Sequence, residues 1–367
     1  MKYKEHILKS ASYKGGATRP NKKGGDSQNK IYKLSSNENL LGPSPKAVEA
    51  IKNSLGSIFE YQHQKDNALK AALVSHFNNG IKESQYITAN SGMEIIDIIC
   101  RGFLSVDNEI VISSPTFKAY KNFAALENAK TIDVPLLAPD FSLDVDGILN
   151  AINENTRLIF ITNPNNPTGT FIPKNKIDYL LDNISDDIVV VYDEVYYHFV
   201  EDETFCNAVN YIKDNKNVIA IHSFSKAYGL AGIRVGYAFS TPEIAEYLQK
   251  ISRPFMISAM STAAAIAALS DYEHIEKTKE LVRTEKKFMY EQFDLLGIQY
   301  WKSQTNFILF KSPIEEEKIV KDFLDKGIMV RPCSKFGAQD HIRVTIGTHK
   351  INTLFFKILK TSLLNKN

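Results

Sequence analysis

Several features that assign chains to common protein classes are missing from this sequence. Its three cysteines, Cys100, Cys206 and Cys333, are far apart and form no C-x-x-C motif. This excludes a disulfide framework, makes a zinc site unexpected and indicates a reducing compartment such as the cytoplasm. No apolar run approaches the roughly 18 residues of a membrane span, and the first residues lack a signal-peptide core, so neither feature is predicted.

The catalytic motifs of several large enzyme classes are absent as well. The chain has no G-x-x-x-x-G-K-[ST], no G-x-G-x-x-G after a strand, no H-E-x-x-H and no G-x-S-x-G. These absences disfavour nucleotide hydrolysis, dinucleotide binding, zinc-dependent proteolysis and α/β-hydrolase chemistry. The net charge of +2 gives no general reason to expect a nucleic acid or an acidic partner.

The composition is that of an ordinary globular protein. The chain has 367 residues, of which 44% are hydrophobic and 23% charged, enough for two domains with sizeable cores. Apolar segments typical of strands alternate with helix-like stretches, which predicts an α/β fold with a mainly parallel sheet sandwiched by helices. After residue 252 the pattern changes to long helices and a few strands. We therefore expect a large domain over 38–252, and a smaller α+β domain over 253–367 with the arm 1–37 packed on it.

One lysine follows a predicted buried strand in the segment HSFSKAYGLAGIRVGY, residues 222–237. Burying an ammonium group without a partner is costly, so the head of Lys226 either reaches water or belongs to a special site. In the second case burial depresses its pKa and makes it a nucleophilic amine able to form a Schiff base. The segment alone leaves both interpretations open.

The spacing of the same segment favours the second interpretation. Arg234 lies eight residues after Lys226, a separation of roughly 26 Å in an extended chain. The chain must double back if both residues are to serve one small ligand, and glycines such as Gly229 allow tight reversals. With Ser223 and Ser225 beside the lysine, the segment predicts a site for a phosphate and an aldehyde.

This segment resembles the cofactor lysine region of fold-type I pyridoxal-phosphate enzymes, and most closely that of histidinol-phosphate aminotransferases. The resemblance extends over six segments in the family's order, from Ser35 to Thr348. It implies a three-layer α/β sandwich, with Lys226 forming a Schiff base to pyridoxal 5'-phosphate. It also implies that Ser223, Ser225 and Arg234 hold the cofactor phosphate.

A second phosphate contact is predicted at the start of a helix. The sequence YITANSGMEIIDIICRGFL, residues 86–104, is typical of a strand, a turn and a helix. Ser91 and Glu94 form a capping-box pattern at the turn. The unpaired N–H groups and the dipole of a helix start attract phosphate, although most capped helices bind nothing. Together with Lys226, the turn Ser91, Gly92 and Met93 is expected to hold the phosphate.

Three further strands end in residues suited to an aromatic cofactor, because open α/β sheets bind ligands beyond the carboxyl ends of their strands. Phe117 is either a core residue or, by the resemblance, the ring stacked on the pyridine. Asp193 either caps the next segment or keeps a pyridine nitrogen protonated. The resemblance also implies that Asn166, rather than Asn163, and Tyr196 bind the phenolic oxygen.

Substrate contacts are implied mainly by the resemblance. Arg343 is either an exposed strand arginine or the family's bidentate clamp for the substrate α-carboxylate. Arg331 corresponds to a second arginine, used for the distal phosphate of histidinol phosphate. Asn37 is expected near the substrate carboxylate, and Tyr13 lies in an arm near the mouth of the site.

A homodimer is also implied. In the family a tyrosine at the place of Tyr61 reaches the cofactor phosphate of the neighbouring subunit, although the residue taken alone is better explained by packing. The following Gln62 and His63 stand where the family usually has proline and an acid.

The expected activity is transfer of an amino group between an amino acid or histidinol phosphate and a 2-oxo acid. Glutamate is the expected amino donor, and histidinol-phosphate transamination in histidine biosynthesis is the first choice. The alternatives are an aromatic amino-acid transaminase, an enzyme similar to threonine-phosphate decarboxylases, or a non-catalytic regulator with the same fold. The expected partners are small molecules and a second copy of the chain, with no nucleic acid, membrane or metal.

Overall fold

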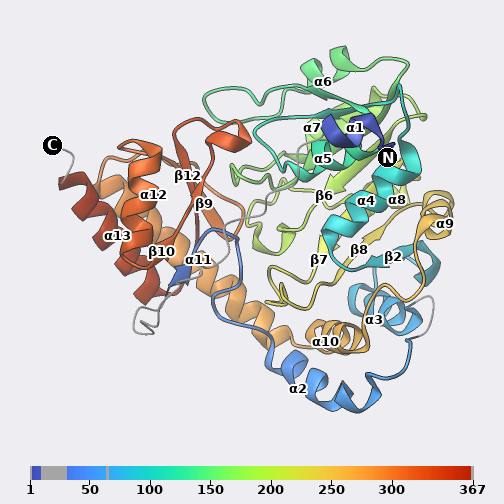
Figure 1. Cartoon of the computed structure of the whole chain (residues 1–367), viewed down its shortest axis with the longest axis horizontal. Coiled ribbons are helices and arrows are strands. Elements are labelled where there is room, and N and C mark those ends of the chain that lie inside the picture. The colour runs from blue at the N-terminus through green and yellow to red at the C-terminus, as the bar shows by residue number, and fades with distance from the viewer. Residues whose placement is uncertain (1, 10–30, 63–65, 365–367) are drawn as a thin grey trace.

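The computed structural model describes residues 2–9, 31–62 and 66–364. Figure 1 shows two bodies of different size. The larger one, on the right, is built around a central sheet, and the smaller one, orange to red on the left, contains the C-terminal part of the chain. The long helix α11, Tyr272–Leu295, runs between them. No helix of the described residues is both long and apolar enough to cross a membrane.

The central sheet has seven strands in the order β2-β8-β7-β6-β5-β3-β4. All of the pairings among β3 to β7 are parallel, and only β8 runs antiparallel to its two neighbours. Five strands are buried along their whole length, as expected for a sheet that is covered on both faces. The strands are Tyr86–Ala89 (β2), Glu109–Ile112 (β3), Lys130–Asp133 (β4), Thr156–Thr162 (β5), Val189–Asp193 (β6), Val218–Ser223 (β7) and Gly236–Phe239 (β8).

Alternate residues of these strands enter two different cores, so helices cover both faces. Ile219 and Ile221 of β7 pack with one set of helices, whereas Val218 and Ala220 pack with the other. The first set is Gly92–Phe103 (α4), Ala119–Leu126 (α5) and Pro242–Ile251 (α9). The second set is Pro45–Ser54 (α2), Asn67–Phe77 (α3), Val145–Ala151 (α6), Lys174–Asp182 (α7), Ala208–Lys213 (α8) and Ala259–Leu269 (α10). This arrangement confirms the predicted three-layer α/β sandwich.

A separate core lies in the smaller body. It contains a three-stranded antiparallel sheet in the order β11-β12-β9 and a short parallel pair of β1 with β10. The elements are Tyr32–Lys33 (β1), Phe307–Lys311 (β9), Ile328–Met329 (β10), Arg331–Pro332 (β11), His341–Thr345 (β12), Glu316–Asp325 (α12) and His349–Leu364 (α13). Helix α10 packs instead on α2 and α3 of the larger body. The predicted boundary at 252/253 stays a prediction.

The N-terminal residues contact both bodies. Strand β1 pairs with β10 of the smaller body, as expected for the arm. Helix α1, Glu5–Lys9, lies against α5 of the larger body, where the His6 ring is 3.1 Å from the carbonyl oxygen of Leu126. Residues 32–33 therefore contact the smaller body and α1 contacts the larger one, and the grouping of the whole arm with the small domain stays a prediction.

Candidate active site

One cavity of about 220 Å³ lies at the carboxyl ends of β5, β6 and β7, facing the small sheet. The structure brings most of the residues predicted for a cofactor and a substrate into its wall. They are Asn37, Ser91, Gly92, Met93, Phe117, Asn166, Asp193, Tyr196, Ser223, Ser225, Lys226, Arg234, Arg331 and Arg343. Residues from both bodies therefore meet at one place, although their individual roles stay predictions.

The loop that carries Lys226 doubles back as the spacing required. Leu230 donates its N–H to the carbonyl of Phe224, and Phe224 donates to Val235, so β7 passes directly into the antiparallel β8. Gly229 makes the reversal possible, because it has a φ of +71° and a Cβ there would lie 2.3 Å from the carbonyl oxygen of Gly42. Because of this reversal, Arg234 and Lys226 line the same cavity.

The Lys226 amine lies in a setting that favours its neutral form. Its Nζ donates to the carbonyl oxygen of Ser36 over 2.9 Å and lies 5.8 Å from the centre of the Tyr196 ring. Burial, followed by the positive charge of Arg343, lowers the pKa of Lys226 to about 7, although Glu38 opposes this shift. A neutral amine is a nucleophile and a proton acceptor, so the interpretation in which this head simply reaches water is the weaker one.

Asp193 ends β6 with its carboxylate in the cavity wall. Tyr120 donates its hydroxyl proton to one carboxylate oxygen over 2.7 Å, and the N–H of Val195 donates to the other. Burial raises the pKa of Asp193 to about 6, and the bond from Tyr120 opposes this. A buried carboxylate without a cationic hydrogen-bond partner is suited to a group that brings its own positive charge.

One end of the cavity is rich in donors for an anion. The turn at Ser91 leads into α4, and the first N–H groups of a helix have no acceptor inside it. Gly236 allows the close approach of β8, because a Cβ there would lie 2.4 Å from the nitrogen of Gly92. Ser225 and Arg234 line the same cavity from the lysine loop.

The capping box expected at this helix is wrong. The Ser91 side chain makes no capping hydrogen bond, and its φ of +104° turns the residue away from the usual cap geometry. Glu94 instead accepts from the N–H of Asn90 and pairs with Arg253 over 2.8 Å. The Ser91 hydroxyl therefore remains among the groups that line the cavity.

The opposite wall is built by the small sheet and by Asn166. Arg343 on β12 is buried and donates to the amide oxygen of Asn166 and to the carbonyl of Ser35. The alternative of an exposed strand arginine is therefore wrong. Asn163 is the weaker choice in the same turn. Its side chain forms hydrogen bonds with the Tyr192 hydroxyl and with the backbone of Ile172 inside the large body, so it stabilises the turn.

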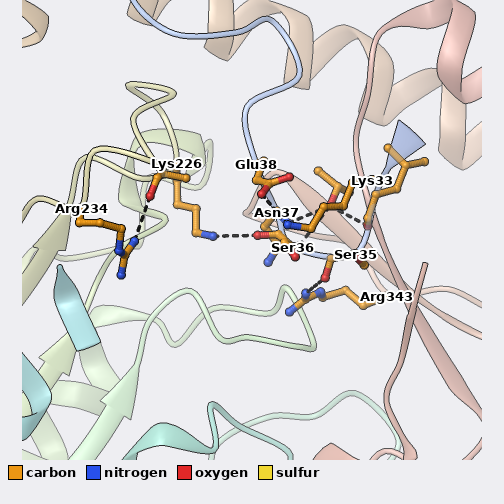
Figure 2. A network of polar contacts seen from close by, with 11 residues as sticks. Lys33, Ser35, Ser36, Asn37, Glu38, Lys226, Arg234 and Arg343 are labelled. Carbon is orange, nitrogen blue, oxygen red and sulfur yellow. Dashed lines mark hydrogen bonds and ion pairs between the residues drawn. The ribbon is translucent and has the colours of Figure 1, made fainter. Parts of the chain in front are cut away.

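The segment from Ser35 to Glu38 crosses the cavity between these two walls (Figure 2). Its carbonyl groups meet Arg343 on one side and Lys226 on the other. The Asn37 amide donates to the Tyr196 hydroxyl over 2.9 Å, and Glu38 pairs with Lys33 over 2.7 Å. The sequence indicated Asn37 but not the backbone contacts of its two neighbours.

Two predicted residues are not in this wall. Tyr61 is 87% exposed, and its ring contacts Phe255 at 4.9 Å on the surface of the larger body. Tyr13 lies outside the described residues. The sequence analysis also missed Tyr120, which holds Asp193. Tyr120 is the second residue of α5, whereas Phe117 precedes this helix, and the centres of their rings lie 5.6 Å apart.

The sequence matches known proteins over most of its length. Residues 29–355 match the model of the family described as aminotransferase class I and II. A histidinol-phosphate aminotransferase from Moorella thermoacetica is 36% identical over 91% of this chain and 86% of the relative. One from Akkermansia muciniphila is 34% identical over 98% of both chains.

Solved structures show the same fold. A histidinol-phosphate aminotransferase from Sinorhizobium meliloti in complex with pyridoxal-5'-phosphate has a TM-score of 0.84 and 25% identity, over 92% of both chains. A Thermus thermophilus aspartate aminotransferase with maleate has a TM-score of 0.80 at 22% identity, over 92% of both chains, and this likeness concerns the fold alone. The chain belongs to the aminotransferase class I and II family, which confirms the predicted pyridoxal-phosphate-dependent aminotransferase of fold type I at the level of the family.

Proposed function

We propose that this protein catalyses the reversible transfer of an amino group between histidinol phosphate and a 2-oxo acid, with glutamate as the amino donor in the biosynthetic direction, and that pyridoxal 5'-phosphate is its cofactor. The observation that carries the proposal is the single cavity that joins an amine of depressed pKa, a buried carboxylate and two arginines of the small sheet. Relatives that cover nearly the whole chain are named histidinol-phosphate aminotransferases, which supports the choice of substrate.

The residues present fit the proposed cofactor. The start of α4, the two serines and Arg234 suit its phosphate, and the carboxylate of Asp193 suits its ring nitrogen. Phe117 and Ile221 line the cavity with flat or branched apolar surface, which suits a ring. When bound, the cofactor supplies an aldehyde for exchange of amines and a ring that withdraws electrons from the substrate α-carbon.

The chain's own residues perform the remaining tasks. Lys226 at a pKa of about 7 accepts and returns a proton at neutral pH, which is the property required of a general base. Asp193 keeps a negative charge opposite the ring nitrogen, and Tyr120 fixes the orientation of its carboxylate. Arg343, held by Asn166 and Ser35, orients the anionic group of the substrate so that the α-hydrogen faces Lys226.

We also infer that the protein acts as a homodimer in the cytoplasm. Tyr61 lies outside the cavity of its own chain, beside the exposed apolar side chains of Leu55, Ile58 and Phe59. Exposed apolar side chains grouped in this way favour burial against another protein surface. A second copy that covers them would bring Tyr61 toward the cofactor phosphate of the partner.

The test is a side-by-side assay of the purified protein with 2-oxoglutarate as amino acceptor. Histidinol phosphate, phenylalanine and threonine phosphate are compared by glutamate formation and by release of carbon dioxide. We expect kcat/KM for histidinol phosphate to exceed the other values by at least about tenfold, which corresponds to roughly 1.4 kcal/mol. A preference for phenylalanine, or decarboxylation of threonine phosphate, contradicts the proposal.

A further inference from the structure

Two arginines of the small sheet point toward the same cavity. Arg331 on β11 is the direct partner of Arg343 on β12, and residues directly opposite each other on paired strands project from the same face. Both line the cavity. They differ in their surroundings, because Arg343 is buried and bonded to Asn166 and Ser35, whereas Arg331 is only half-buried.

A lysine of the large body approaches the same place from the other side. The guanidinium carbon of Arg331 lies 5.0 Å from the centre of the Phe336 ring, and the Nζ of Lys118 lies 5.6 Å from the same centre. Lys118 directly precedes α5 and follows Phe117, which lines the cavity. Lys118 is exposed and does not itself line the cavity, so two cations from different bodies of the protein meet at the Phe336 ring, which does line it.

This cluster has more positive charge than its own contacts explain. Within the part of the chain that the structure describes, neither Lys118 nor Arg331 forms an ion pair. Partial burial, followed by the charges of Arg331, Lys121 and Lys335, lowers the pKa of Lys118. A contact with the Phe336 ring accounts for the position of one cation. It does not account for a second cation of the same sign at that ring, because like charges repel.

We propose that Lys118 is a specificity-determining residue, which binds together with Arg331 the part of an anionic substrate group that Arg343 does not reach. The inference rests on the proposed function. The phosphate of histidinol phosphate lies a carbon and an oxygen beyond the α-carbon, whereas the carboxylate of an amino acid is attached directly to it. A phosphate also carries about −1.5 to −2 charges near neutral pH and three acceptor oxygens. It therefore extends past Arg343 toward Arg331 and Lys118.

The same chemistry is offered by a second source, the side-chain carboxylate of glutamate. Both ligands present an anion that a single arginine does not satisfy. A phosphate gains more from the extra lysine because of its higher charge and its additional oxygens. The experiment therefore includes both ligands and an amino acid with an uncharged side chain.

The test uses the cofactor-loaded holoenzyme and the variant Lys118→Gln, with Lys121→Gln as the matched control. Lys121 lies one turn farther along α5 and carries the same charge, without a recorded contact to the Phe336 ring. Half-reactions with histidinol phosphate, glutamate and phenylalanine are followed by the cofactor absorbance, so that poor substrates remain measurable. We expect Lys118→Gln to weaken the apparent affinity for histidinol phosphate by about tenfold or more, with the limiting rate within about twofold.

The other substrates and variants distinguish a role in anion binding from a general effect on the enzyme. Affinity for phenylalanine should not change, and Lys118→Arg should restore most of the loss. A smaller loss for glutamate assigns the cluster to anions of both substrates, and no loss for glutamate assigns it to phosphate alone. Equal losses for histidinol phosphate and phenylalanine, no loss at all, or an equal effect of Lys121→Gln would overturn the proposal.

One further measurement separates this inference from the proposed function. A wild-type enzyme that shows no preference for histidinol phosphate refutes the proposed substrate by itself. In that case inorganic phosphate is used as a competitor of the phenylalanine half-reaction. Inhibition that is about tenfold weaker in Lys118→Gln than in the wild type supports the anion site, and identical inhibition in both refutes it.

Discussion

Lys226 and Lys286 both have amines that are largely removed from solvent, and they differ in their partners. Lys286 on α11 has a side chain that is only 6% exposed, and its Nζ is 3.1 Å from a carboxylate oxygen of Glu201. The Nζ of Lys226 meets a neutral carbonyl and forms no ion pair within the described ranges. Burial lowers the pKa of both amines. Glu201 opposes the shift at Lys286, whereas Arg343 adds to the shift at Lys226. The comparison indicates that a nearby counter-ion opposes the effect of burial on the pKa of an amine, and that Lys226 lacks an ion pair of this kind within the described ranges.

The adjacent acids Asp193 and Glu194 repeat this contrast. Glu194 is fully buried, and one of its oxygens lies 2.8 Å from the Nε2 of His222 while the other accepts from the N–H of Ala208. Asp193 has only neutral donors and faces the cavity. In both pairs one residue bonds a side chain that can carry the opposite charge, and the other residue bonds only neutral groups and lines the cavity.

The largest expected effect is the difference in kcat between variants of the two lysines. Lys226→Ala should lower kcat for transamination by about 1000-fold or more, because it removes both the nucleophile and the general base. Lys286→Ala, the control, should leave kcat within about threefold. Both values come from steady-state assays at saturating substrates, and substantial turnover by Lys226→Ala would refute the role of this amine.

The second prediction applies to the acids. Asp193→Asn should lower kcat by about 100-fold, since removal of one preorganised electrostatic group typically costs this much. Glu194→Gln should leave kcat within about fivefold and reduce thermal stability instead, because it disturbs a buried network. Unfolding curves measured beside the rates separate the two effects, and reversed outcomes would contradict the division of roles.

The lowered pKa of Lys226 can also be tested without mutation, through the pH dependence of its chemical labelling. A pKa of about 7 means that the Lys226 amine is protonated below pH 7 and mostly neutral above it. Acylation of the cofactor-free protein with a limiting amount of reagent should therefore label Lys226 with a half-maximal rate near pH 7. At pH 8 its labelling should exceed that of the exposed Lys357 by about tenfold, as measured by peptide mass spectrometry. Equal pH profiles for the two lysines would contradict the shift.

The smallest expected effect concerns stability. Lys226→Met in the cofactor-free protein should raise the free energy of unfolding at pH 6 by about 1 kcal/mol, because it replaces a poorly partnered ammonium group by an apolar chain of similar size. The pKa of Lys226 is lowered on folding, so the gain should shrink as the pH rises above 7. Lys286→Met removes a paired charge and should show no such gain. Urea unfolding at two pH values measures both variants.

The elements that short-range patterns define were predictable from the sequence. Buried parallel strands such as β6 and β7 are nearly continuous apolar runs, and the residues that follow them meet at one edge of the sheet. For this reason Lys226 and Asp193 could be placed together before the structure was known. The resemblance to a family with known motifs added Asn166 and Arg343, which no spacing rule connects.

The remaining features depend on long-range contacts that no local pattern encodes. The capping box at Ser91 is absent: Ser91 has a φ of +104°, and Glu94 accepts from the N–H of Asn90 and pairs with Arg253, 159 residues away along the chain. The meeting of Lys118 with Arg331 requires the two bodies to face each other, and the backbone bonds of Ser35 and Ser36 require the crossing of the cavity.

The crossing of residues 35–38 between the two bodies has a practical consequence for anyone who shortens or tags this protein. Strand β1 at Tyr32–Lys33 anchors the crossing segment to β10, and the crossing supplies the oxygen atoms that meet Lys226 and Arg343. A fusion partner or a deletion that disturbs residue 31 onward therefore disturbs a structural part of the proposed catalytic centre, even though it lies nearly two hundred residues before Lys226.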